Sequence, residues 1–104
     1  MPTLTYGTLN VEADAEGYLV QPADWTSDLA QAVAKELGIE LSAEHWKVIE
    51  FARADQAATG QTPGLRRTTQ KTGVSTKDIY RLFPKGPIKL IARIAGIPKP
   101  KSCL

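Results

Sequence analysis

The feature that most constrains this fold is the spacing of glycines and prolines along residues 38–100. Helix-like patterns of apolar residues stop at Gly38, Gly60, Gly73, Pro84-Lys85-Gly86-Pro87 and Gly96. Glycine ends helices because it readily adopts a left-handed backbone, and proline interrupts them because it lacks an N–H group. These breaks predict an array of about five short helices, each of which needs the others to bury its apolar face.

Capping residues mark the expected starts of these helices. Hydroxyl and carboxylate side chains bind the free N–H groups of a first turn, and proline fits the first helical position. We expect helices that follow Asp24-Trp25-Thr26, that follow Ser42 and run to about Gly60, that span Pro63–Thr72, that run from Ser75 to near Phe83, and that start at Pro87. The last helix has an apolar face made of Ile88, Ile91, Ala92 and Ala95.

The N-terminal residues have the pattern of β-strands. Residues 3–6, 8–12 and 18–20 are rich in β-branched and aromatic side chains, and turn-forming residues separate them. We expect a small antiparallel β-meander that packs on the helices, since so small a sheet is marginally stable alone. The 104 residues suffice for one domain, over residues 1–96, and the expected fold class is α+β.

The composition excludes several classes of protein. No apolar run approaches the roughly 20 residues that span a bilayer, and the N-terminus lacks the pattern of a secretory signal. The single cysteine excludes a disulfide within the chain, and one histidine with one cysteine makes no tetrahedral metal site. We expect a protein of the reducing cytoplasm, with no metal, no cofactor and no membrane partner.

Charge is divided unevenly along the chain. Residues 1–60 have a net charge of −7, from three basic and ten acidic side chains, whereas residues 61–104 have +9, from ten basic side chains and Asp78. A basic half favours an acidic partner, a nucleic acid or an anionic sulfur species. Attraction between the two halves within one fold explains part of the division equally well.

The last eight residues, 97–104, cannot form a helix. Pro98 and Pro100 remove N–H donors and favour extended backbone in their neighbours. We expect a flexible C-terminal arm that also contains Lys99 and Lys101 and that reaches about 25 Å when fully extended. Cys103 lies at the second-last position of the sequence, near the end of this arm.

Cys103 is the candidate catalytic residue. A thiol on such an arm is hard to bury and is able to enter the active site of a partner. Lys99 and Lys101 favour the reactive thiolate, whereas the C-terminal carboxylate opposes it. Because thiol exchange requires access and thiolate character, the pattern favours a role in carrying a group between proteins over an unused thiol.

Several motifs resemble those of the DsrC/TusE family of sulfur-carrier proteins. They are Ile94-Ala95-Gly96-Ile97-Pro98-Lys99-Pro100 followed by Cys103, Leu82-Phe83-Pro84-Lys85-Gly86-Pro87 with Lys89, Glu44-His45-Trp46, Gly17-Tyr18-Leu19, Asp24-Trp25, and Pro63 with Arg66. The C-terminal motif is specific, and the matches together cover nearly the whole chain. The resemblance implies a small β-meander packed on about five helices.

The resemblance also implies a sulfur relay, in which Cys103 holds a persulfide and transfers it between sulfur donor and acceptor proteins. The pathway that it implies is tRNA thiolation or dissimilatory sulfur metabolism. Partners then include a sulfite-reductase-like or heterodisulfide-reductase-like complex, and the alternative role is a non-catalytic, gamma-type accessory subunit of the former. Such a sulfurtransferase-type carrier leaves most chemistry to its partners, so whether the chain is an enzyme stays open. We expect a monomer.

Two departures from the family pattern narrow this expectation. The resemblance places a second family cysteine at Ala92, so that a disulfide or a bridging sulfur within this chain is impossible. The stretch over residues 63–83 is also several residues shorter than in typical members. The missing cysteine argues against the complete sulfite-reductase role, and the shorter stretch indicates a divergent homologue with a single cysteine.

Three basic residues are candidates for binding an anionic persulfide or the arm itself: Arg66, Lys89 and Arg93. Lys89 and Arg93 lie four residues apart on the last expected helix and therefore share a face. Exposure to solvent explains their positions equally well. His45, beside Trp46, is expected to pack or to cap a helix rather than to act as a base.

Residues 68–83 also resemble a helix-turn-helix. The basic residues within it and just before it, which would contact phosphates, are Arg66, Arg67, Lys71, Lys77 and Arg81. A DNA-binding regulator is therefore a further alternative. We disfavour a nucleic acid as partner, because helix pairs with a glycine turn are frequent in other proteins and the chain has no separate dimerisation domain.

Overall fold

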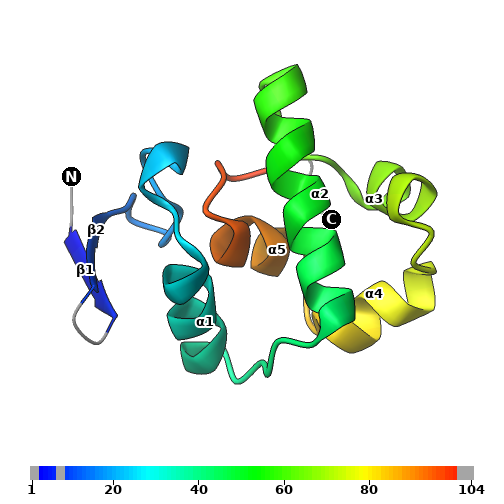
Figure 1. Ribbon diagram of the computed structural model, residues 1–104, viewed down its shortest axis with the longest axis horizontal. Coiled ribbons are helices and arrows are strands. Elements are labelled where there is room, and N and C mark those ends of the chain that lie inside the picture. Colours follow the sequence, from blue (N-terminus) through cyan, green and yellow to red (C-terminus); the bar gives the residue numbers. More distant parts are fainter. Residues whose placement is uncertain (1–2, 7–8, 101–104) are drawn as a thin grey trace.

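Five α-helices pack beside a short β-hairpin in the computed structural model (Figure 1). The structure describes residues 3–6 and 9–100. Its elements are β1 (Thr3–Tyr6), β2 (Leu9–Glu12), the 3-10 helix η1 (Pro22–Asp24), α1 (Ser27–Glu36), α2 (Ala43–Thr59), α3 (Leu65–Thr72), α4 (Thr76–Leu82) and α5 (Pro87–Ala95). Within those ranges no helix has the length and apolar character that a membrane span requires.

The α+β class is confirmed, but the expected three-stranded meander is not. β1 and β2 pair antiparallel, in a register that places Thr3 opposite Glu12. The third expected strand contributes only an isolated bridge between Ala13 and Leu19. Tyr18 and Leu19 are both buried, whereas neighbouring residues of a strand point to opposite faces. Both side chains pack into the core, and the segment pairs with the hairpin through this one bridge rather than along a strand.

The predicted caps of α2 and α4 are confirmed. The Ser42 hydroxyl accepts a hydrogen bond from the backbone N–H of His45, and the Ser75 hydroxyl accepts one from that of Asp78 at 3.1 Å. Each bond satisfies one of the N–H groups that a helix leaves free at its start. Both helices consequently begin where the sequence predicts.

α1 begins directly after Asp24-Trp25-Thr26, as predicted, whereas α3 begins further along the chain than predicted. Asp24 belongs to η1, and the cap of α1 is Thr26, whose hydroxyl accepts a hydrogen bond from the N–H of Leu29 at 3.1 Å. α3 starts at Leu65 rather than Pro63. In both places a short proline-containing segment precedes the helix, and proline fixes the local backbone without committing it to an α-helix.

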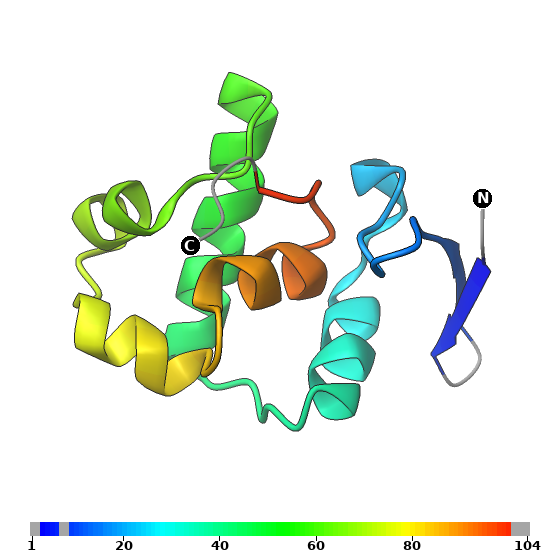
Figure 2. The same ribbon diagram turned by 180° about the vertical axis from the view of Figure 1, so that it is seen from behind.

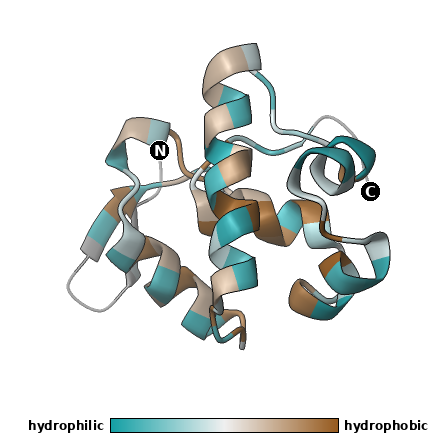
Figure 3. Cartoon of the chain, turned by 45° about the vertical axis from the view of Figure 1, so that its right-hand side comes forward, coloured by the Kyte–Doolittle hydropathy of each residue, from teal (hydrophilic) through white to brown (hydrophobic). Residues whose placement is uncertain are grey.

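α5 lies at the centre of the molecule, where α1 and α2 pack against it (Figures 1 and 3). The predicted apolar face is confirmed, since Ile88, Ile91, Ala92 and Ala95 are all buried. Ile94 is buried as well. α5 is therefore covered on more sides than a surface helix, which fixes the position of its C-terminal end and of the residues that follow.

His45 joins α2 to the end of α4. Its Nδ1 accepts a hydrogen bond from the N–H of Ser42 at 3.0 Å, and its Nε2 donates one to the carbonyl of Leu82 at 2.9 Å. Its ring also meets the edge of the Phe83 ring, with centroids 5.0 Å apart. Both ring nitrogens are occupied, so His45 caps and packs, as the sequence predicts, and has no nitrogen left to act as a base.

Candidate functional site

The root of the expected arm is the C-terminal end of α5. Gly96 ends the helix with a φ of +67°, a conformation that favours glycine. The N–H groups of Gly96 and Ile97 both donate to the carbonyl of Ala92, the latter at 3.1 Å. These two hydrogen bonds to one carbonyl turn the chain sharply away from the helix axis and set the direction in which the arm departs.

Trp25 and Arg53 bind the last carbonyls of α5. The indole Nε1 of Trp25 donates to the carbonyl of Ile94 at 2.9 Å, and Nη1 of Arg53 donates to that of Ala95 at 2.8 Å. These carbonyls would otherwise lack a partner, because helices leave their last C=O groups free. A cation at this end also complements the negative end of the helix dipole. Trp25, which lies between η1 and α1, and Arg53 of α2 thus hold the arm root.

The same two side chains contact each other. The guanidinium carbon of Arg53 lies 4.2 Å from the centroid of the Trp25 ring, in a cation–π arrangement. Burial lowers the pKa of Arg53 from its ordinary value, and its second amino group donates to the carbonyl of Pro22 at 3.2 Å. Trp25 in turn lies against Gly96, where a Cβ atom would come within 2.5 Å of the indole Cδ1. We call Trp25, Arg53 and Gly96 the arm clamp.

Replacing Arg53 by methionine is expected to lower the free energy of unfolding by about 2–3 kcal/mol, because two carbonyls lose a charged donor while the stem is kept. Lys47→Met, at an exposed position of the same helix, is the matched control and should change stability little. Urea unfolding of both variants measures the difference. Equal stability of the two variants would show that the clamp does not bind α5.

The first residues of the expected arm lie against the body of the protein. Ile97 and Pro100 are buried, and the carbonyl of Pro98 accepts a hydrogen bond from the Thr62 hydroxyl at 2.6 Å. Residues 97–100 therefore turn back from the end of α5 toward the α2–α3 connection, as Figure 2 shows. Lys101 and Cys103 lie outside the described residues.

Lys99 ties the arm to the N-terminal turn. Its Nζ lies 2.8 Å from a carboxylate oxygen of Glu16, 83 residues away in the sequence. Both side chains are exposed, so this ion pair directs the segment more than it stabilises it.

The buried Tyr18 lies within reach of these charges. Burial raises the pKa of its hydroxyl, and the charge of Glu16 raises it further. The charges of Lys99 and Arg93 lower this pKa and so oppose the rise.

The three basic candidates occupy different places in the fold. Arg93 lies beside the arm root with its guanidinium against Gly17, and its buried Nε has no hydrogen-bond partner among the described residues. Lys89 is exposed on the first turn of α5, and Arg66 is exposed on the first turn of α3. Arg93 is thus the basic candidate whose charge, like that of Lys99, acts on Tyr18, and the other two lie elsewhere on α5 and on α3.

The helix-turn-helix resemblance corresponds to α3 and α4, which pack together around the turn at Gly73. Arg67 forms a two-oxygen ion pair with the buried Asp55 of α2, with distances of 2.7–3.0 Å. Arg81 lies 3.3 Å from carboxylate oxygens of both Glu44 and Asp78. Two of the five proposed phosphate contacts are therefore already bound to carboxylates of the same chain, which weakens the DNA-binding alternative.

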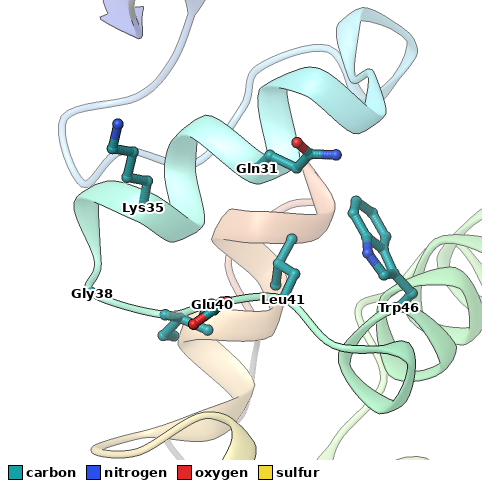
Figure 4. Close-up of a pocket in the computed structure, with 7 residues that line it drawn as sticks. Gln31, Lys35, Gly38, Glu40, Leu41 and Trp46 are labelled. Carbon is teal, nitrogen blue, oxygen red and sulfur yellow. The ribbon is translucent and has the colours of Figure 1, made fainter.

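An open hollow of about 590 Å³ lies between α1 and the start of α2 (Figure 4). Trp46 and Leu41 line it together with polar and charged side chains, among them Lys35 and Glu40. None of its lining residues takes part in the contacts that hold residues 94–100. The hollow is therefore separate from the arm and its clamp.

Sequence reasoning missed the residues that hold the arm. From the sequence, Trp25 is placed only at a helix start and in a family motif, and Arg53, Thr62 and Glu16 have no assigned role. A usable signal existed in Arg53, a charged residue within the apolar stretch of α2. The bonds themselves join residues that are 31 to 83 positions apart, and no local pattern reports such contacts.

The described residues end in a proline-rich segment that is anchored at the end of the central helix α5. In the sequence this segment leads to the single cysteine of the chain. Such an arrangement is that of a carrier, which brings a reactive group to other proteins. The family model described as "DsrC like protein" matches residues 5–104, and the chain belongs to this family. The family membership expected from the sequence is thereby confirmed.

Individual relatives agree with this assignment. The chain is 41% identical over 108 residues to "Sulfurtransferase TusE" of Buchnera aphidicola subsp. Acyrthosiphon pisum (strain APS), covering 97% of this chain and 95% of that protein. The NMR structure of Allochromatium vinosum DsrC has a TM-score of 0.85 at 35% identity, covering 98% and 97% of the two chains. The oxidized gamma-subunit of the dissimilatory sulfite reductase (DsrC) from Archaeoglobus fulgidus has a TM-score of 0.83 at 33% identity, covering 99% and 100%.

Proposed function

We propose that this protein is a sulfur-relay protein that accepts a persulfide sulfur on Cys103 and transfers it to a partner protein, in tRNA thiolation or in dissimilatory sulfur metabolism. The observation that carries the proposal is the anchored segment 97–100, which leads directly to the single cysteine. The sulfurtransferase relatives support the same chemistry.

The proposed reaction is a pair of displacements without net oxidation. The Cys103 thiolate attacks the outer sulfur of a donor protein's persulfide, the S–S bond of the donor breaks, and the donor leaves as a thiolate. Cys103 then carries the persulfide. A thiolate of the acceptor attacks that outer sulfur in turn, which returns Cys103 to its thiolate form.

The anchor supports the proposal by defining where the thiol operates. If the segment up to Pro100 stays on the body, Cys103 is three residues from a fixed point and reaches about 10 Å from it. Release of the contacts of Lys99 and Pro98 would extend that reach to about 25 Å from the end of α5. This range of reach suits partner proteins with a shallow acceptor site as well as those with a deep one.

Basic residues complete the proposed site. A persulfide is more acidic than a thiol and is carried as an anion, which a nearby cation stabilises. We assign this role first to Arg93, because its guanidinium lies beside the arm root and its buried Nε has no partner among the described residues. Arg66 and Lys89 would serve the arm in other positions, together with Lys99 and Lys101 of the arm itself.

Incubation with a low-molecular-weight persulfide or polysulfide should add the mass of one or more sulfur atoms to the intact protein, and a reductant should remove it. Cys103→Ser should abolish this gain, because the chain has no other cysteine. Ser102→Ala, one position earlier, is the matched control and should load normally. A failure of the wild-type protein to gain sulfur from any donor would overturn the proposal.

An accessory subunit of a sulfite-reductase-like complex is the second candidate function. The likeness to the Archaeoglobus fulgidus gamma-subunit favours it. The family resemblance assigns a second cysteine to position 92. Here that position is an alanine, fully buried in α5, and the chain has no second thiol for an internal sulfur bridge. Binding to a reductase that persists in Cys103→Ser, without sulfur loading of the wild type, would favour this second function.

A further inference from the structure

Tyr80 is the one large hydrophobic side chain that is exposed in the described part of the chain, with 47% of its surface accessible. It lies on α4, whose other apolar residues, Ile79 and Leu82, are buried. The core therefore does not need Tyr80. Exposed aromatic side chains of this kind are enriched at the centres of protein interfaces, where they enter a pocket of the partner.

Exposed lysines flank this ring. Lys77 precedes Tyr80 by three residues on α4, so the two share a face of that helix, and Pro84 is exposed just beyond its end. Lys85 follows in the turn to α5 and is exposed as well. We call Lys77, Tyr80, Pro84 and Lys85 the α4 surface. Neither lysine forms an ion pair within the ranges that the structure describes.

Lys85 has a strained backbone. Its φ of +63° makes it the one non-glycine residue with a left-handed conformation among the described residues. A side chain in this conformation costs about 1 kcal/mol relative to glycine, and the side chain of Lys85 is exposed and fills no space in the core. The chain thus keeps an exposed cation at a position where glycine would be more stable.

From these observations we propose that the α4 surface is the docking site for a thiol-bearing protein with an acidic surface, whose apolar pocket receives the Tyr80 ring. The inference rests on the proposed relay function and names the chemistry of its partner. Residues 65–89 contain seven basic side chains and one acidic side chain, whereas α1 exposes two carboxylates, Asp28 and Glu36, and one cation, Lys35. An acidic partner is therefore attracted to the α3–α4 side and repelled from the α1 side.

A protein fits the α4 surface better than a nucleic acid. At its edge Arg81 is bound to the carboxylates of Glu44 and Asp78, so this cation is already paired and is not free for a phosphate. α4 has seven residues, and Tyr80 is a single aromatic ring, whereas proteins that bind single strands use several rings for successive bases. A mixed rim of charges around one aromatic anchor is the pattern of a protein interface.

The arm is well placed to serve a partner at this surface. α4 joins the N-terminal end of α5, and the arm root is at the other end, about 13 Å away along nine helical residues. Residues 97–100 then run back toward the α2–α3 connection, as the bond between Thr62 and Pro98 shows (Figure 2). The described part of the arm consequently lies beside the connection that leads into α3.

The test uses two synthetic peptides of equal length. Each contains one cysteine and one leucine. The remaining side chains are acidic in the first peptide and basic in the second. The full-length protein, loaded with persulfide, should transfer sulfur to the acidic peptide about 10-fold faster at low salt, and high salt should remove the difference. Lys77→Glu with Lys85→Glu should abolish this preference, and Tyr80→Ala should slow transfer to the acidic peptide about 5-fold.

Lys35→Glu with Lys47→Glu, at exposed positions of α1 and α2, is the matched control and should keep the preference. Lys85→Gly adds a readout that separates docking from folding, since it should stabilise the protein while weakening the preference. An equal transfer rate to both peptides, or a preference that only the control pair removes, would overturn the proposal. Loss of salt-sensitive binding to single-stranded RNA in the α4 variants would assign the surface to a nucleic acid instead.

Sulfur loading of Cys103, measured by intact mass in every variant, tests the relay function separately. Variants that load normally and show no preference would leave the relay intact and remove the docking site. Absence of loading in the wild-type protein would remove the relay function itself.

Discussion

Replacement of Gly96 by alanine is expected to lower the free energy of unfolding by about 3 kcal/mol, which is a large part of the stability of a domain this small. Two effects contribute. Alanine resists the left-handed backbone at φ +67°, at a cost of about 1 kcal/mol. Its methyl group would also lie 2.5 Å from the Cδ1 of Trp25, so the indole has to move. Movement of Trp25 breaks its hydrogen bond to Ile94 and loosens the cation–π contact with Arg53.

Gly73→Ala is the matched control for this prediction. Gly73 also ends a helix, has a φ of +76°, and leaves nothing within 4 Å of an added Cβ. Its replacement should therefore cost only the backbone term, about 1 kcal/mol. Denaturant unfolding of both variants gives the difference of about 2 kcal/mol that the contact with Trp25 accounts for. In a Trp25→Ala background the two substitutions should become equal, and a difference that persists there would show that another contact is responsible.

The clamp also gives Gly96→Ala a functional consequence. Because Trp25 and Arg53 bind the last two carbonyls of α5, a displaced indole changes the direction in which residues 97–100 leave the helix. The contact between Thr62 and Pro98 then weakens, and the segment 97–100 that precedes Cys103 in the sequence loses its anchor. Transfer of sulfur to a protein acceptor should fall more than loading from a small persulfide, since the small donor requires no defined arm position.

Much of the helical part of this fold follows from local sequence. A serine hydroxyl next to a free N–H group is a local contact, so Ser42 and Ser75 mark the starts of α2 and α4 correctly. The apolar face of α5 repeats with the helical period and is buried as predicted. These features depend on residues three or four positions apart, and such distances are what a sequence pattern records.

The third strand and the arm contacts depend on distant residues and were not predictable in this way. The segment at Tyr18 has strand-like composition, but its two neighbouring side chains are drawn into the core and only one bridge forms. The arm was expected to be free from residue 97, whereas Ile97, Pro98, Lys99 and Pro100 all contact or face the body. Proline content indicates an extended backbone but does not say what the backbone lies against. Cys103 lies outside the described residues, and its role stays a prediction from the sequence.

The second large effect is expected at Phe83, where replacement by alanine should lower the free energy of unfolding by about 4 kcal/mol. Phe83 is fully buried and is the largest of the fully buried side chains. Its removal leaves a cavity at the junction of α2, α4 and α5 and takes away the ring contact with His45. The hydrogen bond from His45 to the carbonyl of Leu82 then loses the packing that holds the imidazole in place.

Tyr80→Ala provides the comparison for Phe83→Ala on the same segment of the chain. The two residues are three positions apart and have rings of nearly equal size, but Tyr80 is 47% exposed and Phe83 is not exposed at all. Tyr80→Ala should therefore change stability by less than about 1 kcal/mol and affect partner selection instead. Denaturant midpoints, at unchanged slopes, measure the stability of the Tyr80→Ala and Phe83→Ala variants. If the two substitutions destabilised the protein equally, Tyr80 would be a core residue and the α4 surface could not be a docking site. If Tyr80→Ala is folded and stable, one turn of helix separates a ring that holds the protein together from a ring that is available to its partner.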